Sequence, residues 1–496
     1  MEINLKNNEV ANRENRLGSI VAYSGSIKDF AEKSGCAAGC GEKKRCFSQS
    51  SMCNNMCAIG QLFGIYDAAI VQHGPSGCSA IAMGAFMNDL LVKAVGKKPK
   101  ENSGYTCTDM TESDTVFGAI DNLKDVIIET YNRYHPKAIF VAASCVSGVI
   151  GEDMESIVDD LKDIIPVPVA PVHCEGFKTQ IWASGFDAAF HAVLKYIVKP
   201  AQKKTNKVNV INFAGGTSWN SRADVTKLLK VMGLEPTFLL STSTIEELEH
   251  LSEAVATVST CGTLSTYFGN GLEQEFGVPF VRSLQPHGIV GYEDWALKLA
   301  QVVGKENEVQ AYLDEEKRIY LPQIEEFTKK LKGKRAMIAM GPSYSQNYTR
   351  ILQEFGMIVE HVTSWHMDSL YDDGTIPHAL QYNIDNARKN SDLDYSFSVN
   401  DLQNYEFVNI LKKLNPDIFI TRHPAGMIVW SMKLGIPAYN VRDEYTSFGY
   451  VGTLRFAKAL YYTVTNKSFT DNLAKHVKLP YNEWWYHQPA DAFFVD

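Results

Sequence analysis

Six cysteines are crowded into one stretch of the N-terminal part of the chain. They are Cys36, Cys40, Cys46, Cys53, Cys57 and Cys78, and the last of them closes the sequence His-Gly-Pro-Ser-Gly-Cys. Thiolates bind soft metal ions and iron–sulfur clusters when several of them converge in the fold from separate loops. The alternative is a set of reduced cysteines, some packed as small apolar side chains. For Cys36, Cys40 and Cys46 the sequence leaves open an additional cluster or no bound metal.

Two further cysteines, Cys145 and Cys261, are expected at the ends of buried strands. The apolar run 137–145 ends on Cys145, and the run 256–258 leads within three residues to Cys261. In open α/β sheets, ligands bind at the carboxyl ends of the strands. The glycines that precede Cys78 would also let the backbone approach a bulky inorganic ligand. The sequence therefore predicts metal chemistry at the edges of sheets.

The elements that would hold these thiols alternate between strands and helices. Apolar runs predict strands at 137–145, 167–172, 208–213, 256–258, 278–280, 336–340 and 417–421. Amphipathic stretches predict helices at 119–134, 153–164 and 311–332, and a polar segment interrupts the chain at 383–400. This alternation predicts an α/β protein of three Rossmann-like, doubly wound domains with parallel sheets. We expect the domains to span residues 1–200, 201–332 and 333–496.

The composition excludes several classes of partner. The formal net charge of -9 disfavours nucleic acid and anionic membranes. The longest apolar stretch, 138–150, is too short and too often interrupted to span a membrane. The first residues lack the apolar run of a signal peptide. Ten cysteines in 496 residues do not resemble a small secreted disulfide scaffold. We therefore expect a cytoplasmic protein in a reducing environment.

Several motifs follow one another in a characteristic order. They are Cys-Ala at 57–58, the run 67–78, Thr-Asp-Met-Thr-Glu-Ser-Asp-Thr-Val-Phe-Gly at 108–118, Ser-Cys at 144–145 with Ile-Gly-Glu-Asp at 150–153, and Pro-Val-Pro-Val at 166–169 with Cys-Glu-Gly-Phe at 174–177. Together they resemble the nitrogenase component 1 family, the molybdenum–iron-protein-like subunits. The resemblance extends from about residue 15 to residue 465 and agrees with the three-domain prediction.

The resemblance implies metal ligands residue by residue. Cys78 and Cys145 match two of the three thiolates that each subunit gives to a bridging P-type cluster, either [8Fe-7S] or [4Fe-4S]. The third is Cys53 if the sequence is counted without gaps, or Cys57 if the local Cys-Ala pattern decides, and both stay open. Cys261 matches the cysteine that holds a second iron–sulfur metallocofactor, of unknown heterometal, in catalytic alpha-type subunits.

The departures from the family pattern are equally informative. Residues 185–187, Gly426 and residues 440–443 stand where nitrogenases have a histidine, a lysine and a second histidine, and an arginine expected after the cluster motif is absent. Fewer proton donors and less positive charge argue against dinitrogen reduction, which needs repeated protonation in a cationic pocket. His366 or His423 could supply the missing ligand of the metallocofactor.

The resemblance implies a catalytic subunit of a nitrogenase-like, two-component reductase. The chain contains no P-loop motif, so ATP would be hydrolysed by a separate iron–sulfur reductase. A homologous component 1 subunit would complete a hetero-oligomer around the bridging cluster. The branch with the best matching substrate class is methylthio-alkane reductase, which cleaves a carbon–sulfur bond in a small molecule. The alternatives are a non-catalytic scaffold for cofactor assembly, a tetrapyrrole reductase and a metal-free structural subunit.

Overall fold

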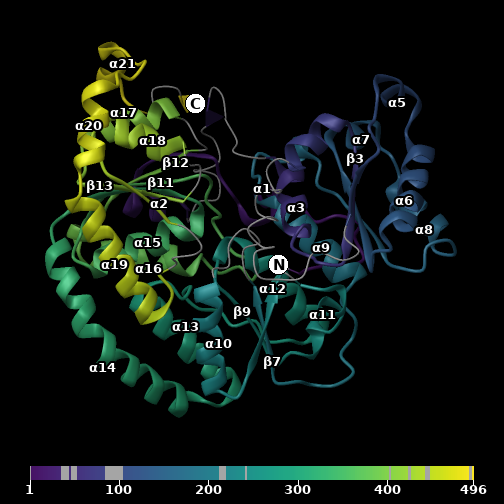
Figure 1. The fold of residues 1–496 in the computed structure, drawn as a ribbon, viewed down its shortest axis with the longest axis horizontal. Helices are drawn as coiled ribbons and strands as arrows, with labels where there is room; N and C mark the ends of the chain where they lie inside the picture. The colour runs from purple at the N-terminus through teal and green to yellow at the C-terminus, as the bar shows by residue number, and fades with distance from the viewer. Residues whose placement is uncertain are drawn as a thin grey trace.

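The computed structural model describes residues 2–34, 44–45, 53–83, 104–211, 219–240, 243–400, 404–422, 426–441, 447–490 and 494–495. Cys36, Cys40, Cys46 and His423 lie outside these residues. The chain is built on parallel sheets with helices on both faces (Figure 1). This confirms the predicted fold class of three Rossmann-like domains.

The first sheet has the strand order β4-β3-β5-β6, and all its strands are parallel. The strands are β3 (Ala68–His73), β4 (Gly104–Cys107), β5 (Ala138–Ala143) and β6 (Val169–Val172). Helices α6 (Ile120–Tyr134) and α8 (Met154–Leu161) cover one face, and α3 (Asn54–Leu62) and α9 (Ser184–Tyr196) cover the other. Successive residues of β5 therefore enter different apolar cores, Ile139 that of α6 and α8, and Phe140 that of α3 and α9.

The other two large sheets are also parallel, apart from one edge strand. The second contains β7 (Lys207–Ile211), β8 (Glu235–Leu239) and β9 (Ala256–Ser259) in the order β8-β7-β9. The third contains β1 (Ala22–Ser26), β10 (Arg335–Met340), β11 (Ile358–Ser364), β12 (Ser396–Asn400), β13 (Ile418–Thr421) and β14 (Ala438–Asn440), in the order β1-β12-β11-β10-β13-β14. Only β1 runs antiparallel to its neighbour.

Several helices lie around the second and third sheets. They are α10 (Trp219–Val231), α12 (Gly262–Phe276), α13 (Gly288–Val303), α14 (Glu306–Leu331), α15 (Pro342–Glu354) and α19 (Gly449–Thr465). The long helix α14 packs along α19 at the periphery, on the side away from the first sheet (Figure 1). One large apolar core runs through both sheets and contains Val258, Trp295, Ile338 and Phe456.

The structure corrects three details of the sequence interpretation. Residues 22–26, which we expected in the first domain, form β1 and pair with β12 of the third sheet. The run 278–280 is not a strand, because it makes only an isolated bridge between Phe280 and Thr257. The polar segment 383–400 is not an interruption, since it contains the end of α16 (His378–Lys389) and the whole of β12.

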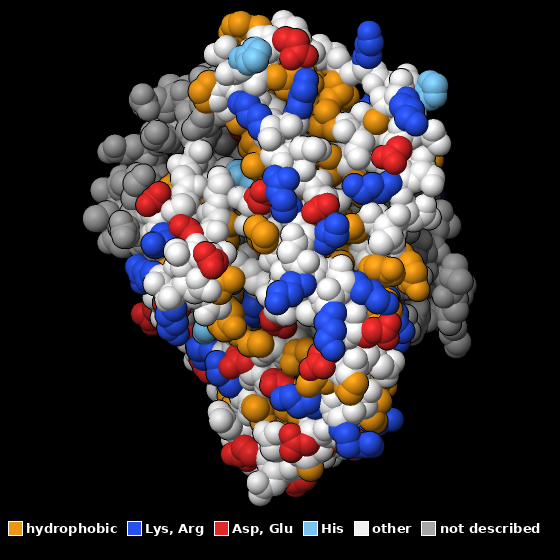
Figure 2. Space-filling model, turned by 90° about the vertical axis from the view of Figure 1, so that its left-hand side faces the viewer, with side chains coloured by type: hydrophobic (Ala, Val, Ile, Leu, Met, Phe, Trp, Pro, Cys, Tyr) orange, Lys and Arg blue, Asp and Glu red, His pale blue; other side chains and the backbone are white. Residues whose placement is uncertain are grey.

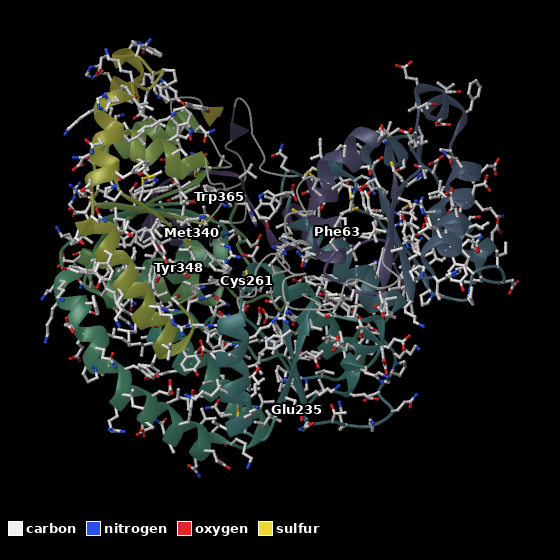
Figure 3. All side chains as sticks on the ribbon, viewed as in Figure 1. Phe63, Glu235, Cys261, Met340, Tyr348 and Trp365 are labelled. Atoms are coloured by element: carbon white, nitrogen blue, oxygen red, sulfur yellow. The ribbon has the colours of Figure 1, made fainter. Side chains whose placement is uncertain are left out.

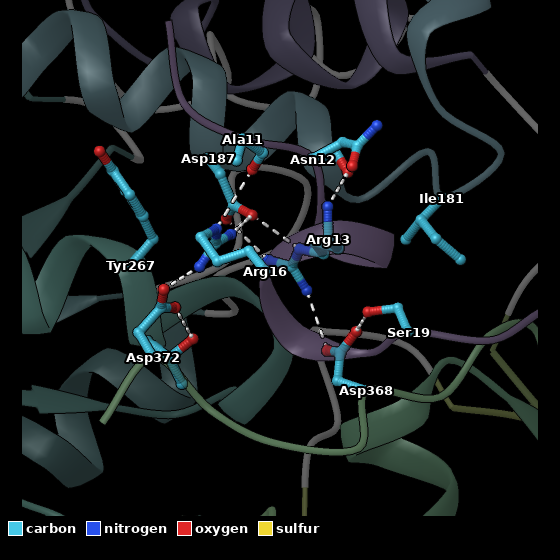
Figure 4. Close-up of polar contacts among 12 residues, drawn as sticks. Ala11, Asn12, Arg13, Arg16, Ser19, Ile181, Asp187, Tyr267, Asp368 and Asp372 are labelled. Atoms are coloured by element: carbon cyan, nitrogen blue, oxygen red, sulfur yellow. Dashed lines mark hydrogen bonds and ion pairs between the residues drawn. The ribbon is translucent and has the colours of Figure 1, made fainter. Parts of the chain in front are cut away.

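A buried network of charges fixes the N-terminal segment in place (Figure 4). Arg13, in the short helix α1 (Arg13–Leu17), donates two hydrogen bonds of 2.8 Å to the Asp187 carboxylate and one of 3.1 Å to Asp368. Arg16 is paired with Asp187 at 2.5 Å and also with Asp372. Burial lowers the pKa of Arg13, but the two carboxylates outweigh this effect and raise it above its ordinary value.

This network connects all three domains. Asp187 belongs to α9 beside the first sheet, and Asp368 follows β11 of the third. Arg13 also donates a hydrogen bond of 2.6 Å to the carbonyl of Thr263, which lies in the first turn of α12 in the second domain. The arginines are therefore satisfied only when the three domains have this relative arrangement.

No described helix combines the length and the apolar character that crossing a bilayer requires. On the face drawn in Figure 2, positive and negative side chains are interspersed.

Replacing Arg13 with methionine is expected to destabilise the protein by about 3–5 kcal/mol, because Asp368 would keep a buried charge without its arginine and Asp187 would keep only Arg16. Urea unfolding followed by circular dichroism measures the change. The matched control is Arg318→Met, which removes an ion pair with Glu315 whose side chains are 71% and 54% exposed, and this change should leave the unfolding transition almost unchanged. Equal losses in the two variants would contradict the role of the network.

Candidate metal centres

The carboxyl edge of the first sheet gathers one cysteine from each of its strands. Cys107 ends β4, Cys78 follows β3 in the helical residues 76–83, and Cys145 follows β5 as the first residue of α7 (Cys145–Ile150). Cys174 comes two residues after β6, and Cys53 approaches as the N-cap residue of α3. Parallel strands bring their carboxyl ends to one edge, so the topology converts five distant positions into one group of thiols.

Gly176 separates two of these thiols. A Cβ atom at this position would lie 3.1 Å from Sγ of Cys145 and 3.7 Å from Sγ of Cys53. A side chain would therefore enter the space between them, and glycine leaves it free. Cys53, Cys78 and Cys145 are also exposed to solvent. The three thiols can accept a metal cluster from outside the fold.

Cys57 does not join this group. It lies one turn further along α3 and is buried, with its Cβ atom 2.9 Å from the position of a Cβ at Gly185 of α9. Cys57 therefore faces the helix packed behind α3, while Cys53 lies beside Cys145 at the sheet edge. The structure therefore places Cys53 in the group of thiols and Cys57 outside it, whereas the sequence left both open as the third ligand.

The other two thiols of the group, Cys107 and Cys174, were not predicted as metal ligands. Cys107 donates a hydrogen bond of 3.2 Å to the carbonyl of Gly74 and accepts one of 3.3 Å from the N–H of Asp109. Cys174 is buried and accepts a hydrogen bond of 3.4 Å from Asn55. Burial raises the pKa of Cys78, and the thiols of Cys145, Cys53 and Cys107 raise it further. A bound cation would relieve this mutual repulsion of thiolates.

Exposed apolar side chains surround the thiol edge. Val116 and Phe117 of α5 (Glu112–Phe117) are 74% and 84% exposed, Val149 of α7 is 73% exposed, and Ile81 is 60% exposed. Helices α5 and α7 are in contact. Apolar groups that lie together on a surface are typical of a protein interaction site.

Cys261 occupies a second, buried position. It is the N-cap residue of α12, and Figure 3 places it near the middle of the molecule, between Phe63 and the third-domain residues Met340 and Trp365. Burial raises the pKa of its thiol, while the Arg422 guanidinium, the N–H groups of the first turn of α12 and the Ser343 hydroxyl act in the opposite direction. These donors would stabilise a ligand sulfur that carries negative charge.

His366 is a buried histidine with free ring nitrogens. It is 1% exposed, and neither nitrogen has a hydrogen-bond partner among the described residues. The Trp182 ring packs edge-on against it at 5.4 Å, and Asp368 lies 3.8 Å from Nε2. Burial lowers the pKa of His366 to about 4, so the imidazole is neutral at pH 7 and keeps a lone pair for a metal ion. Arg13 lowers the pKa of His366, and the charge of Cys261 in turn helps to raise the pKa of Arg13.

Two arginines interact electrostatically with Cys261. Arg422 packs over the Tyr344 ring at 4.0 Å and influences the Cys261 thiol. Arg13 contributes a second buried guanidinium from the N-terminal segment. Both guanidinium groups come from positions that the family motifs do not include, and the charge of Arg13 is paired with Asp187 and Asp368.

Comparison with known proteins assigns the family. The model of the nitrogenase component 1 type oxidoreductases matches residues 53–465. The chain belongs to this family. The match confirms the resemblance that the motifs indicated, and it includes every cysteine of the thiol edge as well as Cys261.

Some relatives of the chain are named as nitrogenase alpha chains, and others are named as cofactor biosynthesis proteins. The chain is 27% identical over 462 residues to the nitrogenase molybdenum-iron protein alpha chain of Methanosarcina barkeri, with 82% of this chain and 85% of the relative covered. It is 26% identical over 446 residues to the nitrogenase iron-molybdenum cofactor biosynthesis protein NifE of Clostridium pasteurianum, with 86% and 92% covered. The solved structure "Nitrogenase Cp1 at pH 6.5" has the same fold, with a TM-score of 0.68, 21% identity and coverage of 88% and 92%.

Alkylation of the metal-free chain tests whether Cys53 is exposed at the sheet edge and Cys57 is buried against α9. Iodoacetamide is expected to label Cys53 and Cys145 much faster than Cys57 and Cys174, because the first pair is exposed and the second pair is buried. Mass spectrometry of the digested protein measures each rate. In urea the four rates should become similar, which provides the internal control. Equal labelling of Cys53 and Cys57 in the folded protein would contradict the geometry.

Proposed function

We propose that the chain is the metal-cluster subunit of a nitrogenase-like, two-component reductase. The observation that carries the proposal is the convergence of three exposed thiols, Cys53, Cys78 and Cys145, at one sheet edge, with a buried Cys261 and an unpartnered His366 further inside. An electron donor can approach the exposed thiols, whereas the buried pair is protected from water. A separate ATP-hydrolysing iron–sulfur protein would supply the electrons.

Cys53, Cys78 and Cys145 would hold a P-type cluster, [8Fe-7S] or [4Fe-4S], which would relay single electrons. The space kept by Gly176 between Cys53 and Cys145 suits such a bulky inorganic group. Three exposed thiols do not enclose a cluster, and apolar side chains surround them. A homologous component 1 subunit would supply the remaining ligands and cover the apolar surface.

Cys261 and His366 would hold the second metallocofactor, where electrons would accumulate and the substrate would bind. A thiolate and a neutral imidazole are both ligands of iron. The unpartnered nitrogens of His366 fit this role, since burying them without a partner is unfavourable. His423 remains a second candidate and lies outside the described residues.

The proposed reaction is reductive cleavage of a carbon–sulfur bond in a small methylthio-alkane. It consumes two electrons and two protons, and it releases methanethiol and a hydrocarbon. Two hydroxyl groups lie near Cys261. The Ser343 hydroxyl lowers the pKa of the Cys261 thiol. The Tyr371 hydroxyl lies so close to Gly262 that it would clash with any side chain there. Burial raises the pKa of Tyr371, so its hydroxyl stays protonated at neutral pH and can donate a hydrogen bond to a bound group.

A scaffold for cofactor assembly is the second candidate. The similarity to NifE, which covers 92% of that protein, supports it. The same residues would then hold a cofactor precursor that is passed to an acceptor protein. The two functions differ in whether the cofactor is retained and in whether a substrate is turned over.

The bridging cluster is tested with Cys53→Ala and Cys57→Ala in protein purified without oxygen. We expect Cys53→Ala to lose bound iron and sulfide and the corresponding EPR signal, because a ligand is removed. Cys57→Ala should keep them, since this thiol faces α9. The two substitutions lie one turn apart on the same helix, so each controls for disturbance of α3. Loss of iron in Cys57→Ala alone would reverse the assignment.

The function is tested with Cys261→Ala, the reductase partner, ATP and a methylthio-alkane. The variant is expected to lose a distinct set of irons and to release methanethiol only at background rate, while the signals of the cluster at Cys78 and Cys145 remain. Unchanged iron and turnover would exclude a cofactor at Cys261. A wild-type protein that shows no turnover and passes its cofactor to an acceptor protein would identify a scaffold.

A further inference from the structure

A hollow of about 260 Å³ lies beside the thiol edge on the first domain. The N-terminal segment, the end of β5, helix α7 and the residues after β6 all contribute to its wall. Its charged and titratable side chains are Glu9, Glu152, Glu155, His173, Glu175 and Lys178. Four carboxylates face one lysine and one histidine, so the hollow favours an additional cation.

Three of these side chains can bind one ion. Glu9, His173 and Glu175 each present a ligand atom, and these atoms lie within 4.8 Å of one another. Ligand atoms at about 2.1 Å from a metal ion are up to about 4.2 Å apart. Only small shifts of side chains would therefore bring the three atoms to a common ion.

Glu175 carries an independent sign that a ligand is missing. Its side chain is almost completely buried, at 3% exposure. One carboxylate oxygen lies 3.1 Å from Lys178 Nζ and 3.8 Å from His173 Nδ1. The other oxygen, Oε2, is buried and has no hydrogen-bond partner among the described residues. A buried carboxylate oxygen without a partner is unfavourable, and a metal ion would satisfy it.

The ammonium group of Lys178 lies where a metal ion would contact the carboxylates. Its Nζ lies 2.6 Å from a carboxylate oxygen of Glu9 and 3.1 Å from Glu175, so it joins two of the three ligand residues. Lys178 ends the short 3-10 helix Gly176–Lys178, and 35% of its side chain is exposed. The flexible ammonium group can therefore turn toward water when another cation takes its place.

We propose that Glu9, His173 and Glu175 form a mononuclear site for a divalent transition-metal ion, in which the ion replaces the Lys178 ammonium. Two carboxylates and an imidazole favour ions such as Mn²⁺, Fe²⁺ or Zn²⁺, because Ca²⁺ and Mg²⁺ prefer oxygen ligands alone. Glu155, whose carboxylate lies 2.7 Å from Nε2 of His173, would orient the imidazole.

The ion would connect the N-terminal segment to the thiol edge. Glu9 lies four residues before Arg13 of the buried charge network, and Glu175 is adjacent to Gly176, which separates Cys53 from Cys145. Binding would therefore restrain both the segment that joins the three domains and the loop beside the cluster thiols. The site depends on residues other than the proposed cluster ligands, so it stands or falls independently of the proposed function.

The test uses Mn²⁺ and the chain purified without oxygen, with its own iron retained. The EPR signal of free Mn²⁺ measures the number of bound ions and their affinity. We expect one site, which His173→Gln and Glu9→Gln weaken by at least about tenfold because each removes a ligand. Lys178→Ala should strengthen binding, since it removes the competing ammonium group. Bound iron, measured in each variant, separates loss of this site from loss of a cluster.

Lys162→Ala is the matched control. This lysine forms an ion pair with Asp159 in which both side chains are 68% exposed, and its removal should leave Mn²⁺ binding unchanged. The proposal is overturned if wild-type and Lys178→Ala proteins bind no Mn²⁺, or if Lys178→Ala weakens binding as much as His173→Gln does. Either outcome would identify Lys178 as a permanent partner of Glu9 and Glu175.

Discussion

The burial of two arginines among three aspartates is the interaction on which the rest of the structure depends. Removing these charges from water is costly, and their pairing repays the cost only when every partner is in place. Arg13 finds Asp187 beside the first sheet, Asp368 beside the third, and the Thr263 carbonyl in the helix that begins after Cys261. Because an unpaired buried charge is unfavourable, the network disfavours any domain arrangement in which one of these partners is out of place.

Both candidate metal centres are positioned by this arrangement. Cys261 lies at the N-terminus of α12, directly before the carbonyl group that Arg13 binds, and His366 comes two residues before Asp368. The thiol edge is connected through α9, which carries Asp187 and packs against α3 behind Cys53. A shift of one domain would therefore leave a buried charge unpaired and would also move the residues that could bind metal.

Part of this could be predicted from the sequence. The strands that lead to Cys145 and Cys261 are continuous apolar runs, because parallel strands are covered by helices on both faces. Strands β11 and β12 were missed because their inward polar groups satisfy one another. His361 contacts the Ser398 hydroxyl at 3.0 Å, and Thr363 and Ser398 are also 3.0 Å apart. The partners of Arg13 are 174 and 355 residues away, and no local pattern reports such pairs.

Helix packing restricts Gly185, one of the three residues 185–187 among which the family resemblance places a histidine. A Cβ atom at Gly185 would lie 2.1 Å from the carbonyl oxygen of Asn54 and 2.9 Å from the Cβ atom of Cys57. Any larger side chain would push α9 away from α3 and would disturb Cys53 at the start of that helix. Asp187, two residues further on, would also leave the buried arginines. The close approach of α3 and α9 thus connects the position of Cys53 to the domain junction, and it leaves room only for glycine at position 185.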